Sequence, residues 1–126
     1  MFLIDTNVLI LAIKGLEPDK SFLKKAISKK KLYLSVITVG EFLSQASEEA
    51  EEKLNELIIR FPTLSINLEI AKLAALYRKN SLKQNRVQLL DCFIAAQAKL
   101  HNLTLVTNNK ADFPHKGIKV ISPNSI

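Results

Sequence analysis

The sequence predicts an α/β domain with a parallel sheet of four to five strands and helices on both faces of that sheet. Short apolar runs alternate with longer helical patterns along the whole chain, which is typical of parallel strand–helix–strand units. The 126 residues suit a single domain, and 48% of them are hydrophobic, enough to build one core. The 24% of charged residues, with only 3 Gly and 4 Pro, excludes a disordered or linker-like chain.

Five apolar runs have the length and composition of strands. They cover residues 2–4, 32–35, 63–66, 103–107 and 119–121, the last as an edge strand. Right-handed crossovers between parallel strands place the carboxyl ends of the strands at one edge of the sheet. Open α/β sheets bind their ligands at that edge, so the residues that follow each strand are the first candidates for a site.

Helices are predicted in the segments between these strands. They cover residues 8–13, 19–28, 48–61 and 89–101, together with segments that start at residues 38 and 67. Gly15 and Pro18 end the first helix. Thr38 and Glu41 have the spacing of a capping box, which predicts that the third helix begins at Thr38. Asn67 is the expected cap of the fifth.

The sequence predicts a cytoplasmic protein without a membrane partner. No apolar run approaches the roughly 18 residues of a membrane-spanning helix. The first residues lack the basic flank and small-residue cleavage site of a signal peptide. The single cysteine, Cys92, cannot form an internal disulfide, which fits a reducing compartment.

The chain is basic, with 18 Lys and Arg against 12 Asp and Glu, a net charge of +6 and an isoelectric point near 9.5. Such a balance favours polyanionic partners, although it also fits a merely solvated basic surface. Two stretches, residues 24–31 and 78–86, concentrate the basic side chains without interleaved aromatic residues. Contacts to phosphate rather than base stacking are therefore expected. The candidate nucleic-acid contacts are Lys24, Lys25, Arg78 and Arg86.

Four acidic residues lie in apolar surroundings, each expected at a strand end or in the first turn of the following helix. We call them the acidic quartet: Asp5, Glu41, Asp91 and Asp112. Any one of them could simply cap a helix, which is worth about 0.3–1 kcal/mol. Parallel topology brings all four to one edge, where clustered carboxylates repel each other and are costly to desolvate. A divalent cation is the simplest compensation, and it suits the hydrolysis of phosphodiester bonds.

Small polar residues follow the same strands and could orient the carboxylates or water, although capping alone also explains them. They are Thr6, Ser35, Thr38, Thr107, Asn108 and Asn109. His101 and His115 lack the spacing of a zinc pair, and a single cysteine cannot make a thiolate site. No Gly-rich phosphate-binding loop is present in the sequence.

Four blocks of the sequence carry a resemblance that covers essentially the whole chain. They read LIDTNVL at 3–9, SVITVGEF at 35–42, LDCFIAAQA at 90–98 and LVTNNKADF at 105–113. One such block is moderately specific, whereas four in this order at this chain length are highly specific. On these blocks the chain resembles the PIN-domain family, and within it the VapC-type toxin ribonucleases of toxin–antitoxin pairs.

The resemblance implies one PIN domain over residues 1–126, acting as a metal-dependent endoribonuclease with Mg²⁺ or Mn²⁺ as cofactor. The acidic quartet matches the family's acidic positions, and Thr6 and Asn109 match its accessory polar positions. We expect Asp5, Asp91 and Asp112 to hold metal and Glu41 to ligate it or to order a water molecule. The family also implies an RNA substrate, a homodimer and a small cognate antitoxin protein encoded alongside.

Three other interpretations remain open. A phospho-acceptor receiver domain has a similar length, but it would need adjacent acids after the first strand, where this chain has Asp5, Thr6 and Asn7. A non-catalytic PIN-like RNA-binding module is the main alternative, and the presence of all four acids argues against it. The third is cleavage of DNA by the same chemistry.

Overall fold

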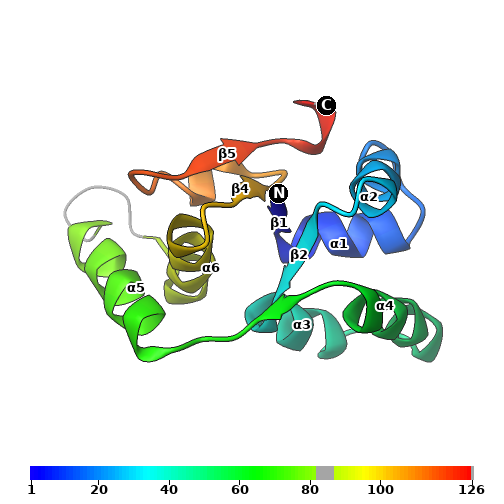
Figure 1. Cartoon of the computed structure of the whole chain (residues 1–126), viewed down its shortest axis with the longest axis horizontal. Coiled ribbons are helices and arrows are strands. Elements are labelled where there is room, and N and C mark those ends of the chain that lie inside the picture. The colour runs from blue at the N-terminus through cyan, green and yellow to red at the C-terminus, as the bar shows by residue number, and fades with distance from the viewer. Residues whose placement is uncertain (82–86, 126) are drawn as a thin grey trace.

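The computed structural model describes residues 1–81 and 87–125 and confirms the predicted α/β architecture (Figure 1). Five parallel strands form one sheet in the order β3-β2-β1-β4-β5. They are β1 (Phe2–Ile4), β2 (Leu32–Ser35), β3 (Thr63–Leu64), β4 (Thr104–Val106) and β5 (Lys119–Ile121). Receiver domains have the strand order 2-1-3-4-5, so the topology excludes that interpretation.

The described part of the chain contains six α-helices and two short 3₁₀ helices. They are α1 (Thr6–Ile13), α2 (Asp19–Ser28), α3 (Val36–Leu43), α4 (Glu48–Arg60), α5 (Leu68–Ser81), α6 (Leu89–Leu100), η1 (Lys110–Asp112) and η2 (Pro123–Ser125). Within residues 1–81 and 87–125, none of these helices has the length and apolar character needed to cross a membrane.

The sheet has a hydrophobic core on each face, because successive strand side chains point in opposite directions. On one face, Ile4, Leu34 and Val106 are fully buried among side chains of α1, α2, α3 and α4. On the other face, Leu3 and Leu105 pack against α6, and α5 covers α6 from outside. Figure 1 shows α5 and α6 on one side of the strands and the other four helices on the opposite side.

The third helix begins earlier than the capping box predicts. Ser35 is its N-cap, with Ser35 Oγ accepting a hydrogen bond from the backbone N–H of Ile37 at 3.1 Å. The prediction was wrong because Ser35 both ends β2 and caps α3, which leaves no loop between them. Thr38 is therefore a buried residue of the first turn of α3 rather than its cap, and Glu41 lies in the second turn rather than the first.

The burial of α6 is less uniform than its apolar sequence predicts. The middle of the helix is fully enclosed, with Cys92 and Ile94 both inaccessible to solvent. Leu89 and Leu90, by contrast, are 46% and 45% exposed. These two leucines begin the helix at the carboxyl edge of the sheet, so the first turn of α6 is open to solvent there.

Candidate active site

Asp5 stands directly after β1, and its carboxylate is held from two sides. Asp5 Oδ1 accepts a hydrogen bond from the backbone N–H of Thr6 at 2.8 Å and so caps α1. Asp5 Oδ2 accepts one from the hydroxyl of Thr107 at 2.9 Å, just after β4. The ends of two neighbouring strands therefore fix the orientation of this carboxylate.

Glu41 reaches the same place from α3. The hydroxyl of Thr6 donates to Glu41 Oε1 at 2.6 Å, and Thr6 Oγ1 also lies 3.5 Å from Thr38 Oγ1. Thr6, the residue directly after Asp5, is thus connected to a helix more than thirty residues further along the sequence. The structure places the predicted accessory residue Thr6 between two members of the acidic quartet.

The electrostatics of Asp91 and Asp5 show that the quartet converges. Burial raises the pKa of Asp91 to about 7, and repulsion from Asp5, Asp112 and Glu41 adds to that rise. Burial also raises the pKa of Asp5, against the lowering effect of the hydrogen bonds from Thr107 and Thr6, while Glu41 and Asp112 raise it further. Asp91 and Asp5 therefore each experience the charges of Glu41 and Asp112 at the carboxyl edge of the sheet.

No positive side chain forms a salt bridge with the quartet in the described part of the chain. The one salt bridge found among residues 1–81 and 87–125 joins Lys53 and Glu49 on α4. Within the same residues, no three Asp, Glu, His or Cys side chains form a ready-made ligand group for one ion. The carboxylates therefore gather as an uncompensated negative patch rather than as a closed coordination cage.

Residues 107–113, here called the site loop, carry Asn109 and Asp112. The backbone N–H of Asn109 donates to the hydroxyl of Thr107 at 3.1 Å, and the N–H of Asp112 donates to the carbonyl of Asn109 at 3.1 Å. The sequence patterns did not single out Asp19, which is 2% exposed and accepts a hydrogen bond from Asn108 Nδ2 at 2.7 Å. No local signal marks Asp19, because its partner lies 89 residues further along the chain.

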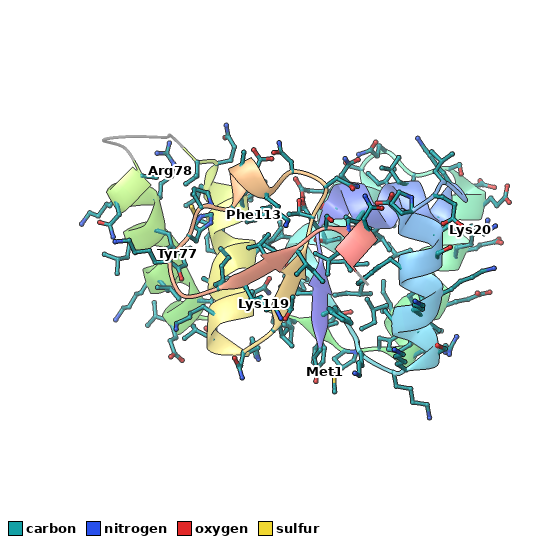
Figure 2. The ribbon with its side chains drawn as sticks, turned by 90° about the horizontal axis from the view of Figure 1, so that it is seen from above. Met1, Lys20, Tyr77, Arg78, Phe113 and Lys119 are labelled. Carbon is teal, nitrogen blue, oxygen red and sulfur yellow. The ribbon has the colours of Figure 1, made fainter. Side chains whose placement is uncertain are left out.

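The candidate basic residues do not form one surface. Lys24 and Lys25 are exposed on α2, whereas Arg78 in the last turn of α5 is half-buried. Arg86 lies outside the described residues. In Figure 2, Arg78, Phe113 and Lys20 lie on the side away from Met1, with Arg78 and Lys20 at opposite ends of it.

Two further basic residues are close to the site loop and were missed by the sequence patterns. Lys20 is exposed and directly follows Asp19, whose side chain contacts the loop. Lys110 is exposed in η1, inside the loop itself. An isolated lysine carries no pattern of its own, so only their place beside or within the site loop identifies these two.

The single cysteine is part of the core, as its position on α6 predicts. Cys92 is inaccessible to solvent, and its Sγ lies 3.5 Å from Nε2 of His115. The ring of His115 in turn packs edge-on against Tyr77. Burial raises the pKa of Cys92 to about 11, which keeps the thiol protonated and unreactive at neutral pH.

Comparisons with known proteins identify the family of this chain. Ribonuclease VapC10 of Mycobacterium tuberculosis is 29% identical over 115 residues, covering 90% of this chain and 86% of that protein. The fold matches a DNA-bound VapBC from Salmonella typhimurium with a TM-score of 0.79 and 26% identity, covering 97% of each chain. It matches a toxin–antitoxin complex from Klebsiella pneumoniae with a TM-score of 0.76 and 28% identity, covering 100% of each chain. The PIN domain profile matches residues 2–119, so the chain belongs to the PIN domain family and is of the VapC type within it.

Proposed function

We propose that this chain is a divalent-metal-dependent endoribonuclease and the toxin component of a toxin–antitoxin pair. The observation that carries the proposal is the convergence of four carboxylates at the carboxyl edge of the sheet, without a basic partner in the described part of the chain. The relative named a ribonuclease supports the activity proposed for this chain, and the similar toxin–antitoxin complex supports its role as a toxin. A purely structural cluster of this kind would cost stability without compensation.

The donor set of the quartet fits Mg²⁺ or Mn²⁺, because both ions prefer carboxylate oxygens. Asp5, Asp91 and Asp112 would hold the ion. Mg²⁺ commonly keeps several waters and takes only one or two carboxylates directly, so at least one of these three residues would hold the ion through a bound water. The described residues contain no group of three side chains that could ligate one ion together. When bound, the ion would polarise the scissile phosphate and favour ionisation of the attacking water.

The protein side chains would then orient the carboxylates, a water molecule and the RNA chain. Thr107 and the N–H of Thr6 keep the Asp5 carboxylate in one orientation while leaving each of its oxygens a free lone pair. Thr6 holds Glu41 through Oε1, so Oε2 of Glu41 is the oxygen that could order a water molecule. Asn109, at the start of the site loop's 3₁₀ turn, would contact the RNA chain beside Asp112.

Basic side chains around the quartet would attract the RNA phosphates that the carboxylates repel. The earlier candidates Lys24, Lys25, Arg78 and Arg86 remain part of the proposal. Lys20 and Lys110 join them because both are exposed beside the site loop.

The decisive experiment compares cleavage of matched RNA and DNA oligonucleotides by the wild-type chain and by Asp91→Asn. We expect cleavage of RNA in Mg²⁺ or Mn²⁺, none in excess chelator, and a loss of at least about 10²-fold in Asp91→Asn with an unchanged circular dichroism spectrum. Glu56→Gln, which removes an exposed carboxylate from α4, is the matched control and should cleave at the wild-type rate.

Each contrary result points to a specific alternative. Full activity in excess chelator would contradict the metal-dependent chemistry. RNA binding without cleavage under all ionic conditions would favour the non-catalytic RNA-binding module. Preferential cleavage of the DNA oligonucleotide would favour a deoxyribonuclease with the same site.

We also propose that the chain forms a homodimer and binds a small antitoxin protein. An antitoxin would bind near the acidic edge, where an Arg or Lys side chain could replace the positive charge of the metal. Purification from the native cell should therefore recover a stoichiometric small partner. Light scattering of the chain separated from that partner should give twice the mass of one chain. Recovery of the chain alone as a monomer would contradict both expectations.

A further inference from the structure

Asp19, the first residue of α2, has a carboxylate that is almost completely buried, with 2% of the residue exposed. A buried carboxylate is costly unless partners stabilise its charge. No basic side chain in residues 1–81 and 87–125 forms a salt bridge with it. Its charge is favoured by the amino end of α2, and Asn108 Nδ2 donates a hydrogen bond to Oδ2 at 2.7 Å.

Asn108 lies in the site loop, which also carries Asp112, the last member of the quartet. Immediately before it, Thr107 bonds to Asp5, and immediately after it, Asn109 accepts the backbone N–H of Asp112. The site loop is thus fastened to β1 through Thr107 and to α2 through Asn108. The second attachment reaches a helix that contributes no member of the quartet.

The helix α2 is itself packed into the hydrophobic core, so it can hold the site loop in place. Its buried residues Phe22, Leu23 and Ala26 pack in the same core cluster as Val8 and Leu9 of α1. The N-cap of α1 is Asp5 itself. A loop tied to α2 is therefore tied to the same rigid unit that orients Asp5.

Asp112 depends on that attachment more than the other members of the quartet. Within the described residues its carboxylate has neither a hydrogen bond nor a salt bridge, and Asp112 is exposed. The course of the loop backbone sets its position: Phe113 anchors the loop on one side of Asp112 in the core beside α6, and Asn108 adds a polar attachment to α2 on the other side.

We propose that Asp19 is a positioning residue: through Asn108 it holds the site loop so that Asp112 faces Asp5 and Asp91. This inference rests on the proposed function, because it gives Asp19 a role in forming the metal and RNA site without touching either. The bond is separate from the hydrogen bonds by which Thr6 and Thr107 hold Asp5 and Glu41, and its two side chains neither cap a helix nor belong to the quartet.

The first test measures amide hydrogen exchange in the metal-free protein. Asp19→Ala and Asn108→Ala should accelerate exchange at Asp112 and Phe113, whose N–H groups close the 3₁₀ turn, by at least about tenfold. Asp19→Asn should stay within about threefold of wild type, because its amide oxygen can still accept from Asn108. Asn67→Ala, which removes the 2.9 Å cap of α5, is the matched control and should leave the loop unchanged.

The second test measures Mn²⁺ binding by calorimetry on the folded protein without RNA. Asp19→Ala and Asn108→Ala should weaken binding by about three- to tenfold, whereas Asp19→Asn should restore it to within twofold. In an Asp112→Asn background the same two changes should have no further effect, because the residue through which they act has lost its charge. Asn108→Ala alters a surface side chain, so the test stands even if Asp19→Ala fails to fold.

The outcomes separate this inference from the proposed function. A wild-type chain that binds no Mn²⁺ and cleaves no RNA overturns the proposed function and the metal role of Asp19. Unchanged loop exchange in both alanine variants overturns the positioning role even if wild type is an active nuclease. Faster loop exchange with wild-type Mn²⁺ affinity, or equal weakening in the Asp112→Asn background, also overturns it.

Discussion

Asp5 is both the N-cap of α1 and a member of the acidic quartet, two roles that the sequence presents as alternatives. Its Oδ1 caps α1, as an ordinary helix N-cap does, while its Oδ2 is held by Thr107 at the edge where the quartet converges. Each carboxylate oxygen has two lone pairs, so both hydrogen bonds leave room for a metal or a water. Asp91 differs, because within the described residues its carboxylate has no hydrogen bond and experiences mainly burial and repulsion.

At the residue scale, Asp91→Asn should stabilise the metal-free protein at neutral pH. The folded-state pKa of Asp91, about 7, lies above its ordinary value of 3.8, so the folded protein holds a proton that the unfolded chain releases. That contribution to stability is fully present below pH 3.8 and is lost as the pH rises through about 7. Thermal melts in chelator should therefore show a higher melting temperature for Asp91→Asn at pH 8, and a smaller difference at pH 5.

Added metal should reverse this ranking. Mg²⁺ or Mn²⁺ should stabilise wild type more than Asp91→Asn, because an ion that binds only the folded state stabilises it by mass action. Glu56→Gln, an exposed carboxylate on α4, should show neither effect. If Asp91 were only a helix-terminus charge, Asp91→Asn would instead be neutral or destabilising by about 0.5–1 kcal/mol at pH 8.

At the scale of elements, Gln97 sets the position of the helix that carries Asp91. This amide is fully buried, and its Oε1 accepts from the hydroxyl of Ser35 at 2.5 Å. Its Nε2 donates to the carbonyls of Leu64 at 3.0 Å and Ser65 at 3.3 Å. One side chain therefore joins α6 to the N-cap of α3 and to the end of β3.

Gln97→Leu should destabilise the fold by about 2–4 kcal/mol, because it leaves the Ser35 hydroxyl and two carbonyls without their buried partner. Urea denaturation of the metal-free protein should show this as a lower midpoint. Gln45→Leu makes the same chemical change at an exposed position and should shift the midpoint little. Equal midpoints for the two variants would mean that the Gln97 network contributes nothing measurable.

At the scale of the whole molecule, the direction of α2 spreads the lysines from Lys20 to Lys31 between the two edges of the sheet. The helix starts beside the site loop, where Asp19 contacts Asn108, and runs back to the amino edge of the sheet. There the carbonyl of Lys31 accepts the backbone N–H of Phe2 at 2.7 Å, at the start of β1. Lys20 therefore follows the residue that contacts the site loop and Lys31 lies at the opposite edge, with Lys24 and Lys25 between them.

This arrangement predicts which lysines contact RNA. Lys20→Gln and Lys110→Gln should each lower the slope of log affinity against log salt by about 0.7 for single-stranded RNA, the value of one phosphate contact. Lys31→Gln removes the same charge at the amino edge and should leave the slope unchanged. Binding titrations from low to high salt in chelator decide this, and equal slopes for all three variants would contradict an RNA path along the carboxyl edge.

The order of strands and helices, and the apolar surroundings of the quartet, could be predicted from the sequence because they depend on neighbours in the chain. Alternating apolar runs and the right-handed crossover rule together placed Asp5, Asp91 and Asp112 at one edge, and Asn67 caps α5 as expected. The start of α3 could not be predicted correctly. Ser35 and Thr38 are both competent caps, and only packing of Thr38 into the interior decides between them.

The hydrogen bonds that orient the site were decided by the tertiary structure alone. Thr107 meets Asp5 across 102 residues, and Asn108 meets Asp19 across 89. Burial of Asp19, the spread of the lysines along α2 between the two edges and the raised pKa of Asp91 arise in the same way. No local pattern encodes such contacts, because a hydrogen bond or a desolvated charge depends on which distant segments the sheet brings together.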